Sequence, residues 1–171
     1  MTAPANPAER MVWKTIVWTW PLYGLGALYV VGPVIAWLLA GLVALSLYLG
    51  PAIRSDLRAT GPIPPVVQLW MVAMLVMLVA LWAGHMNWNL GLKQTIKSSI
   101  GWAKGWALLA LFPLAGAVLP IRREVLIRAM CRLGFWTLCI SPVLLIAPYI
   151  GLPERIWTSP LKAVGGPGPE Y

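Results

Sequence analysis

The chain has 171 residues, of which 60% are hydrophobic and only 11% are charged, and its formal net charge is +8. So few charges among so many apolar residues exclude a water-soluble globular domain of this size. The composition predicts an all-α, polytopic transmembrane helix bundle. Its basic residues are expected to meet membrane lipids from short loops, and without a soluble basic domain the positive charge does not indicate a nucleic-acid partner.

Residues 15–53 contain no charged side chain. As a single helix they would extend about 58 Å, nearly twice the ~30 Å thickness of a hydrocarbon core. Gly32-Pro33 lies near the middle, where glycine ends a helix at little cost and proline lacks a backbone donor. The sequence therefore predicts two passes, at residues 15–31 and 34–53, joined by a tight turn at Gly32-Pro33.

Further along the chain, apolar runs predict three more passes, at residues 66–84, 101–120 and 133–152. The bundle would then occupy residues 15–152 with about five passes, several of them interrupted by proline or glycine. Residues 1–14 form a polar N-terminus without a signal-peptide cleavage site. Residues 153–171 form a tail rich in proline and glycine, and because such a tail resembles a linker, we expect the protein to continue beyond it.

Five passes place the N-terminus and the loops at 54–65 and 121–132 on one side of the membrane. That side holds eight lysine and arginine residues, and the other side holds five. The positive-inside rule then predicts a cytoplasmic N-terminus. A single helix over residues 15–53 would divide the lysine and arginine residues seven against six between the two sides, which fits the rule less well. The connector 85–104 and the tail are therefore predicted to be extracytoplasmic.

The connector 85–104 combines two patterns at helical spacing. Its apolar positions are Leu92, Ile96, Ile100 and Ala103, and its basic positions are Lys93, Lys97 and Lys104. This pattern predicts an amphipathic segment that lies on the membrane surface, or the polar start of the next helix. Lysines on the extracytoplasmic side run against the positive-inside rule, and a lipid headgroup or diphosphate as their partner would be one reason for them. The alternative is that these lysines extend to the interface and bind no ligand.

Recognisable catalytic chemistry is missing from the sequence. It has no hydrolase elbow, P-loop, dinucleotide fingerprint or set of metal ligands, so no catalytic residue, metal or cofactor is predicted. All five acidic residues lie outside the predicted passes, which argues against an ion-coupled transporter core. For His85, an interfacial hydrogen-bonding group is the better interpretation than a catalyst.

Three loose motifs and one distinctive motif point to a family. They are Lys-x-x-x-Lys-Ser-Ser-Ile-Gly-Trp leading into Leu-Leu-Ala-Leu-Phe-Pro-Leu, the Ile-Arg-Arg loop, the alternation of short apolar hairpins, and the closing Gly-Pro-Gly-Pro-Glu-Tyr. Together they resemble the N-terminal part of bacterial O-antigen ligase/polymerase-like proteins, especially members that assemble capsules or exopolysaccharides. The resemblance implies a multi-pass glycosyltransferase of the bacterial inner membrane that acts on polyprenyl-diphosphate-linked oligosaccharides at the periplasmic face, without a metal.

In that family the key histidine and arginine residues lie mostly in later periplasmic loops, so no catalytic residue is assigned to this sequence, and the chain alone is expected to be inactive. The resemblance is compatible with a supporting role for Lys93, Lys97 and Lys104 in holding a diphosphate. Two alternatives remain open. One is a complete, small, non-enzymatic membrane scaffold or complex subunit, which the lack of charge within the passes favours. The other is a transporter fragment, which would need inverted repeats.

Overall fold

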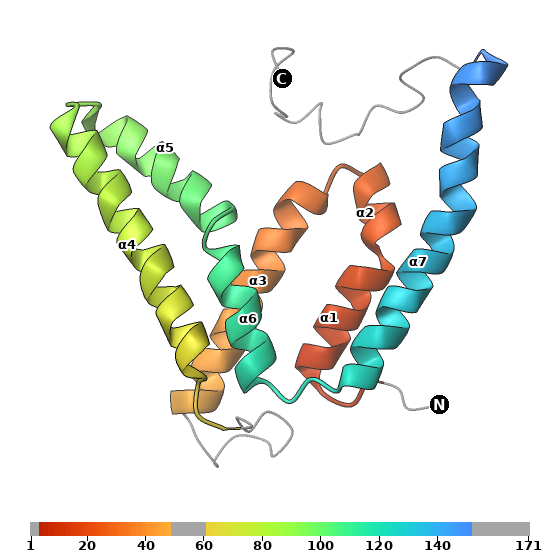
Figure 1. Ribbon diagram of the computed structural model, residues 1–171, viewed down its shortest axis with the longest axis horizontal. Coiled ribbons are helices and arrows are strands. Elements are labelled where there is room, and N and C mark those ends of the chain that lie inside the picture. Colours follow the sequence, from red (N-terminus) through yellow and green to blue (C-terminus); the bar gives the residue numbers. More distant parts are fainter. Residues whose placement is uncertain (1–3, 49–60, 152–171) are drawn as a thin grey trace. The chain divides into compact units, whose positions relative to one another are not determined.

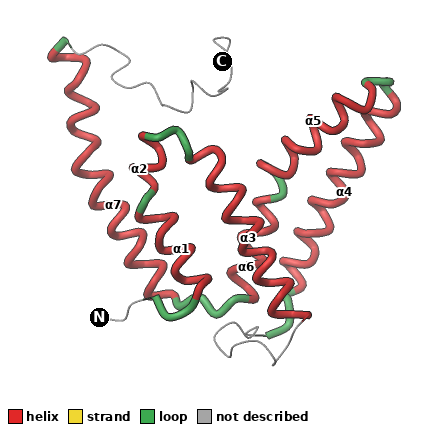
Figure 2. Tube along the Cα trace, turned by 180° about the vertical axis from the view of Figure 1, so that it is seen from behind, coloured by secondary structure: helices red, strands yellow, loops and turns green. Residues whose placement is uncertain are grey.

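The computed structural model describes residues 4–48 and 61–151, and all regular secondary structure in these residues is helical (Figures 1 and 2). The predicted all-α class is therefore confirmed. In chain order the helices are α1 (Pro7–Val17), α2 (Thr19–Gly24), α3 (Leu28–Tyr48), α4 (Pro65–Asn87), α5 (Gly91–Lys104), α6 (Leu108–Val118), α7 (Arg123–Ile146) and the 3-10 helix η3 (Ala147–Ile150).

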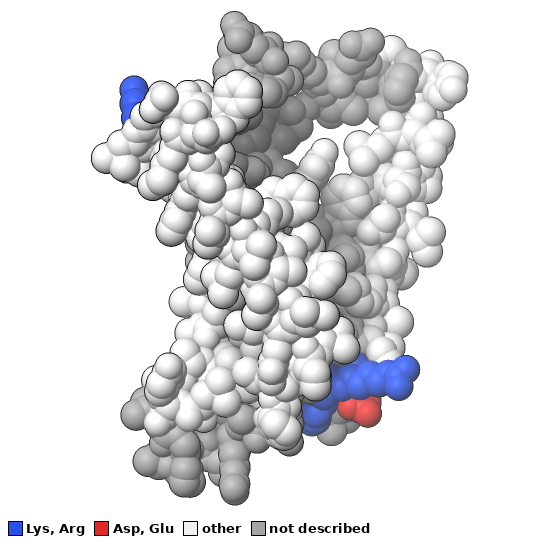
Figure 3. Space-filling view, turned by 60° about the vertical axis from the view of Figure 1, so that its left-hand side comes forward, with Lys and Arg blue, Asp and Glu red and all other residues white. Residues whose placement is uncertain are grey.

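Four helical segments among the described residues are long and apolar enough to cross a membrane: α3, α4, α5 continued by α6, and α7. The space-filling view agrees, because the charged atoms on the visible face lie near helix ends and the surfaces between them are uncharged (Figure 3). By length and composition the structure thus supports a membrane protein, with four candidate spans among the described residues.

The chain divides into two compact units. The first consists of residues 1–32 and 122–171 and contains α1, α2 and α7. The second consists of residues 33–121 and contains α4, α5, α6 and most of α3.

In the first unit, α1 packs along α7 (Figure 1). The helix begins where the Oδ1 atom of Asn6 accepts a hydrogen bond of 2.8 Å from the backbone N–H of Glu9, and Pro7 follows at the first helical position, where no donor is needed. The residues with the lowest exposure on the two helices include Ala8 of α1 and Ala129 of α7. Small side chains at these positions permit a close approach of two helices.

The chain turns back after α2, at residues 25–27. The N–H of Ala27 bonds to the carbonyl of Leu22 and the N–H of Gly26 to that of Tyr23, both at 2.9 Å. Gly26 has φ = +72°, so the turn is a Schellman motif with glycine in the left-handed position. The turn that was predicted at Gly32-Pro33 therefore lies about six residues earlier along the chain.

Gly32 and Pro33 instead lie inside α3. Because α3 begins at Leu28, Pro33 is in its second turn and removes only one internal hydrogen bond, which a long helix tolerates. The predicted first pass, 15–31, is thus divided among the end of α1, α2 and the start of α3. Residues 49–53 of the second predicted pass lie outside the described residues.

In the second unit, α5 and α6 run back along α4 and both contact it (Figure 1). The connection between α4 and α5 is tight, with Asn89 at φ = +49° and Gly91 at φ = +79°. Helix α4 covers the predicted pass 66–84. The buried residues of α3 are Ala36, Leu39, Val43 and Ser46, whose alternating spacing of three and four places them on one face.

Two other predicted segments differ from the helices of the structure. The pass at 101–120 is divided by a turn near Gly105, which separates α5 from α6. The loop at 121–132 is almost entirely the beginning of α7, because arginine and glutamate are good helix formers and Glu124 lies at the positive end of the helix dipole. Pro142 lies within α7 without ending it. The tail 153–171 lies outside the described residues.

Candidate functional site

The three lysines predicted to form a site lie on one face of α5. At 100° per residue, their directions around the helix axis differ by no more than about 40°. All three side chains are exposed. Beside them runs an apolar stripe that is also strongly exposed, at 76%, 51% and 49% for Leu92, Ile96 and Ile100. The structure thus brings the predicted residues together on an amphipathic helix.

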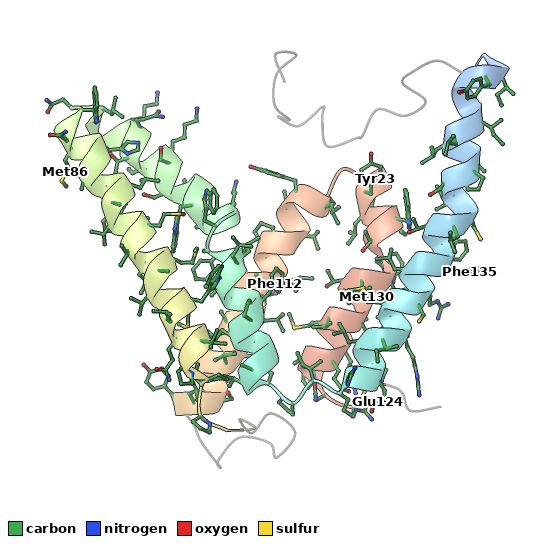
Figure 4. All side chains as sticks on the ribbon, in the orientation of Figure 1. Tyr23, Met86, Phe112, Glu124, Met130 and Phe135 are labelled. Carbon is green, nitrogen blue, oxygen red and sulfur yellow. The ribbon has the colours of Figure 1, made fainter. Side chains whose placement is uncertain are left out.

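The opposite face of α5 packs against α4 through hydroxyl groups. The indole Nε1 of Trp82 donates to the Oγ atom of Ser99 at 2.8 Å, and the Oγ atom of Ser98 lies 3.0 Å from the Nε2 atom of His85. Both serines point away from the lysine side of the helix, given the 3.6-residue period. These contacts therefore turn the lysines away from α4. Figure 4 shows Met86 at the end of α4 where these contacts occur.

His85 has both ring nitrogens occupied. Its Nδ1 atom lies 2.7 Å from the carbonyl oxygen of Leu81, which can only accept, so Nδ1 carries a proton and donates it. Ser98 is the partner of Nε2. In a hydrolytic triad a carboxylate orients the base, whereas a helix carbonyl does so here. The arrangement is that of a hydrogen-bonding group between two helices.

An ion pair that the sequence did not reveal joins α1 to the start of α7. The carboxylate of Glu9 has no exposed surface, and it accepts four hydrogen bonds. Arg122 donates three of them, from Nε to Oε1 at 2.7 Å, from Nη2 to Oε2 at 2.8 Å and from its backbone N–H to Oε1 at 3.0 Å. The backbone N–H of Ala5 donates the fourth, to Oε2 at 2.8 Å. Two parallel bonds from one guanidinium form the strong, bidentate type of ion pair.

This geometry lowers the pKa of Glu9. The hydrogen bond from the Arg122 side chain is the main cause, and the backbone N–H groups of Ala5 and Arg122 contribute, so that the pKa falls from 4.5 to about 2 although burial opposes the change. A partial signal was present in the sequence, because Asn6 and Glu9 have the three-residue spacing of a helix capping box. The partner at Arg122 could not be found by spacing.

A small open pocket lies between α2 and α7, lined by Thr19, Trp20, Tyr23 and Leu144. Its wall is fixed by a hydrogen bond of 3.0 Å from the Nε1 atom of Trp20 to the Oγ1 atom of Thr137. The Thr19 hydroxyl also donates to backbone carbonyls of α1, and the Thr137 hydroxyl donates to the carbonyl of Leu133 in α7, so the pocket is mainly apolar.

The described residues contain no group of three or more histidine, cysteine, aspartate or glutamate side chains that could hold a metal ion. Comparison with known proteins found no match to a family model, a curated protein or a solved structure. The resemblance to O-antigen ligase-like proteins therefore depends on the sequence motifs alone.

Proposed function

We propose that this chain is the membrane-embedded portion of an O-antigen ligase-like glycosyltransferase, and that α5 binds a polyprenyl-diphosphate-linked glycan at the extracytoplasmic face of a bacterial inner membrane. The observation that carries the proposal is the exposed face of α5, on which Lys93, Lys97 and Lys104 adjoin an apolar stripe. A polyprenyl diphosphate has the matching chemistry, an anionic group joined to a long apolar chain.

The charges set the expected strength of binding. A lysine near an anionic membrane group contributes about 1 kcal/mol, so three lysines would contribute about 3 kcal/mol, or roughly a hundredfold in affinity. Lysine acts as a flexible point charge, which suits a diphosphate whose position varies with the lipid chain. The contacts of Ser98 and Ser99 with α4 support the proposal, because they hold the lysine face away from the rest of the unit.

The test is a binding measurement on the whole chain in nanodiscs of zwitterionic lipid, with a polyprenyl diphosphate as the probe. The triple variant Lys93→Gln, Lys97→Gln, Lys104→Gln should bind about a hundredfold more weakly, and the matching lysine-to-arginine variant should keep most of the affinity. Three exposed cations outside α5 provide the charge-matched control: Arg10, Arg123 and Arg132, each replaced by glutamine. Unchanged affinity in the lysine variant, or an equal loss in the control, would refute the proposal.

A non-enzymatic scaffold or complex subunit is the second candidate, and one observation favours it. Helix α4 has no buried residue, and apolar side chains such as Val66 and Leu69 are more than 70% exposed. In a subunit of a complex, helices of a partner protein would cover part of such a surface, whereas lipid would cover it in a chain without partners. Copurification of a defined hetero-oligomer, together with no affinity for the diphosphate probe, would favour the subunit.

A further inference from the structure

We infer that α1 and α2 together form a discontinuous membrane crossing that enters the bilayer on the same side as α7 and runs parallel to it. Neither helix is among the four candidate spans, because α1 has 11 residues and α2 has 6. The inference is independent of the proposed function, because it uses only contacts within the first unit and the order of the crossings.

Two contacts fix the direction of α1 and α2. Glu9 bonds to Arg122 just before α7 begins, and Trp20 bonds to Thr137 well inside α7. The later residue of the first segment thus contacts the later residue of α7, so the two segments run in the same direction. From Glu9 to Trp20 the helical rise is about 16 Å, which is more than half of a ~30 Å hydrocarbon core. Since α7 is a candidate span, a segment that follows it over this distance enters the membrane beside it.

The number of crossings leads to the same result. Helices α5 and α6 return along α4, so α3, α4 and α5–α6 are three successive crossings between the turn at residues 25–27 and Arg122. Three crossings place Arg122 on the side opposite to the start of α3. Because Glu9 contacts Arg122, Glu9 also lies opposite to the start of α3. The segment that separates Glu9 from α3 must then cross the membrane itself.

The backbone carbonyls at the break between α1 and α2 have hydrogen-bond partners, as they need inside a membrane. Non-helical backbone inside a bilayer must find other partners for its polar groups, and serine or threonine side chains commonly supply them. Here the hydroxyl of Thr19 lies 2.9 Å from the carbonyl oxygen of Ile16 and 3.1 Å from that of Thr15, and so reaches across the break at Trp18. The turn after α2 satisfies its carbonyls through the Schellman bonds.

Aromatic residues mark the far end of this crossing. Tyr23 near the end of α2 is 64% exposed, and Tyr29 near the start of α3 is 73% exposed. Figure 4 shows Tyr23 at the end of α2, and Glu124 at the start of α7 where the ion pair lies. Tyrosine is enriched at the interface between lipid and water. Glu9 and Arg122 thus lie on one side of the crossing, and the two tyrosines mark the interface on the other side.

The experiment is cysteine labelling in sealed vesicles of known orientation, using a membrane-impermeant maleimide and a background with Cys131→Ala and Cys139→Ala. Four single substitutions at exposed positions report the sides: Arg10→Cys, Leu25→Cys, Gln94→Cys and Arg123→Cys. The first and last should react from one side and the other two from the opposite side. Labelling after addition of detergent shows that every cysteine is reactive.

Reaction of Arg10→Cys and Leu25→Cys from the same side would overturn the inference, because α1 and α2 would then not cross. Reaction of Arg10→Cys and Arg123→Cys from opposite sides would overturn it as well. As a second measurement, Glu9→Gln is added to the Arg10→Cys variant. The cysteine should still react from the same side, because the crossing depends on the apolar segment rather than on the ion pair.

Discussion

Replacing Glu9 with glutamine should lower the free energy of unfolding by about 2 to 3 kcal/mol at neutral pH. The shift of the Glu9 pKa from 4.5 to about 2 corresponds to about 3 kcal/mol, at about 1.4 kcal/mol for each unit of pKa. The lower end of the range allows for Arg122, whose side chain is 39% exposed and therefore partly screened by solvent.

The same shift predicts how stability depends on pH. The folded state holds Glu9 ionised at pH values where the unfolded state binds a proton, so the stabilisation is fully present above about pH 5. It is lost progressively as the pH falls from 4.5 toward 2. The Glu9→Gln variant lacks this carboxyl and should lose less stability over that interval than the wild type does.

The assay is unfolding in mixed micelles with an increasing fraction of denaturing detergent, followed by the fluorescence of the 11 tryptophans at several pH values. Glu124→Gln is the matched control, because Glu124 is exposed near the start of α7 and should contribute less than about 1 kcal/mol. If Glu9→Gln unfolds at the same detergent fraction as the wild type, or keeps the wild-type pH dependence between 2 and 5, the ion pair does not stabilise the protein as argued.

Three further substitutions test the local structure in the same unfolding assay. Gly26→Ala should destabilise by about 1 to 2 kcal/mol, because φ = +72° strains any residue with a Cβ atom, while Gly24→Ala, with open space around its Cβ position, should be close to neutral. Thr19→Val should cost about 1 kcal/mol because it removes the donor at the helix break. Thr15→Val should cost less, because the Thr15 hydroxyl bonds to a carbonyl inside a regular helix. Equal losses of stability in the two variants would contradict the role given to the break. Ser98→Ala should cost about 1 kcal/mol and weaken the attachment of α5 to α4. The weaker attachment should appear as faster amide hydrogen exchange in α5 only. Unchanged exchange would show that other contacts hold α5 in place.

The membrane class and the lysine face were predictable because both follow from local periodicity. A run of apolar residues with no charge predicts a spanning helix whatever its partners are, and α4 closely follows the predicted bounds. The three lysines share a face of α5 because of the helical period alone. Neither result needs knowledge of which helices are neighbours.

The turn at Gly26 was missed because the local sequence offers two candidates. Gly32-Pro33 is the stronger breaker by composition, and Gly26 is a single glycine between apolar residues. The outcome depends on where the helix begins. Pro33 in the second turn of α3 removes one hydrogen bond, whereas the turn at Gly26 forms two. Hydropathy cannot distinguish these cases.

The Glu9–Arg122 pair could not be predicted, because 113 positions separate the two residues. Each has a plausible local interpretation, Glu9 as a capping residue of α1 and Arg122 as a loop cation that sets topology. The contact arises only when α1 packs against α7, which depends on the whole order of crossings between them. Long-range pairs of this kind leave no periodic signal in a single sequence.

This pair also bears on the charge asymmetry of the sequence. With Glu9 and Arg122 on one side, the basic residues near both belong to that side: Arg10, Lys14, Arg122, Arg123, Arg128 and Arg132. That distribution is the eight-to-five division of the sequence rather than the seven-to-six one, and the positive-inside rule then favours a cytoplasmic position for the pair. With the crossing inferred for α1 and α2, the start of α5 would be three crossings from Glu9 and therefore on the opposite side, where lysines are disfavoured by topology. An anionic ligand at Lys93, Lys97 and Lys104 would offset that disadvantage, so the labelling and the diphosphate-binding experiments test two parts of one argument by separate measurements.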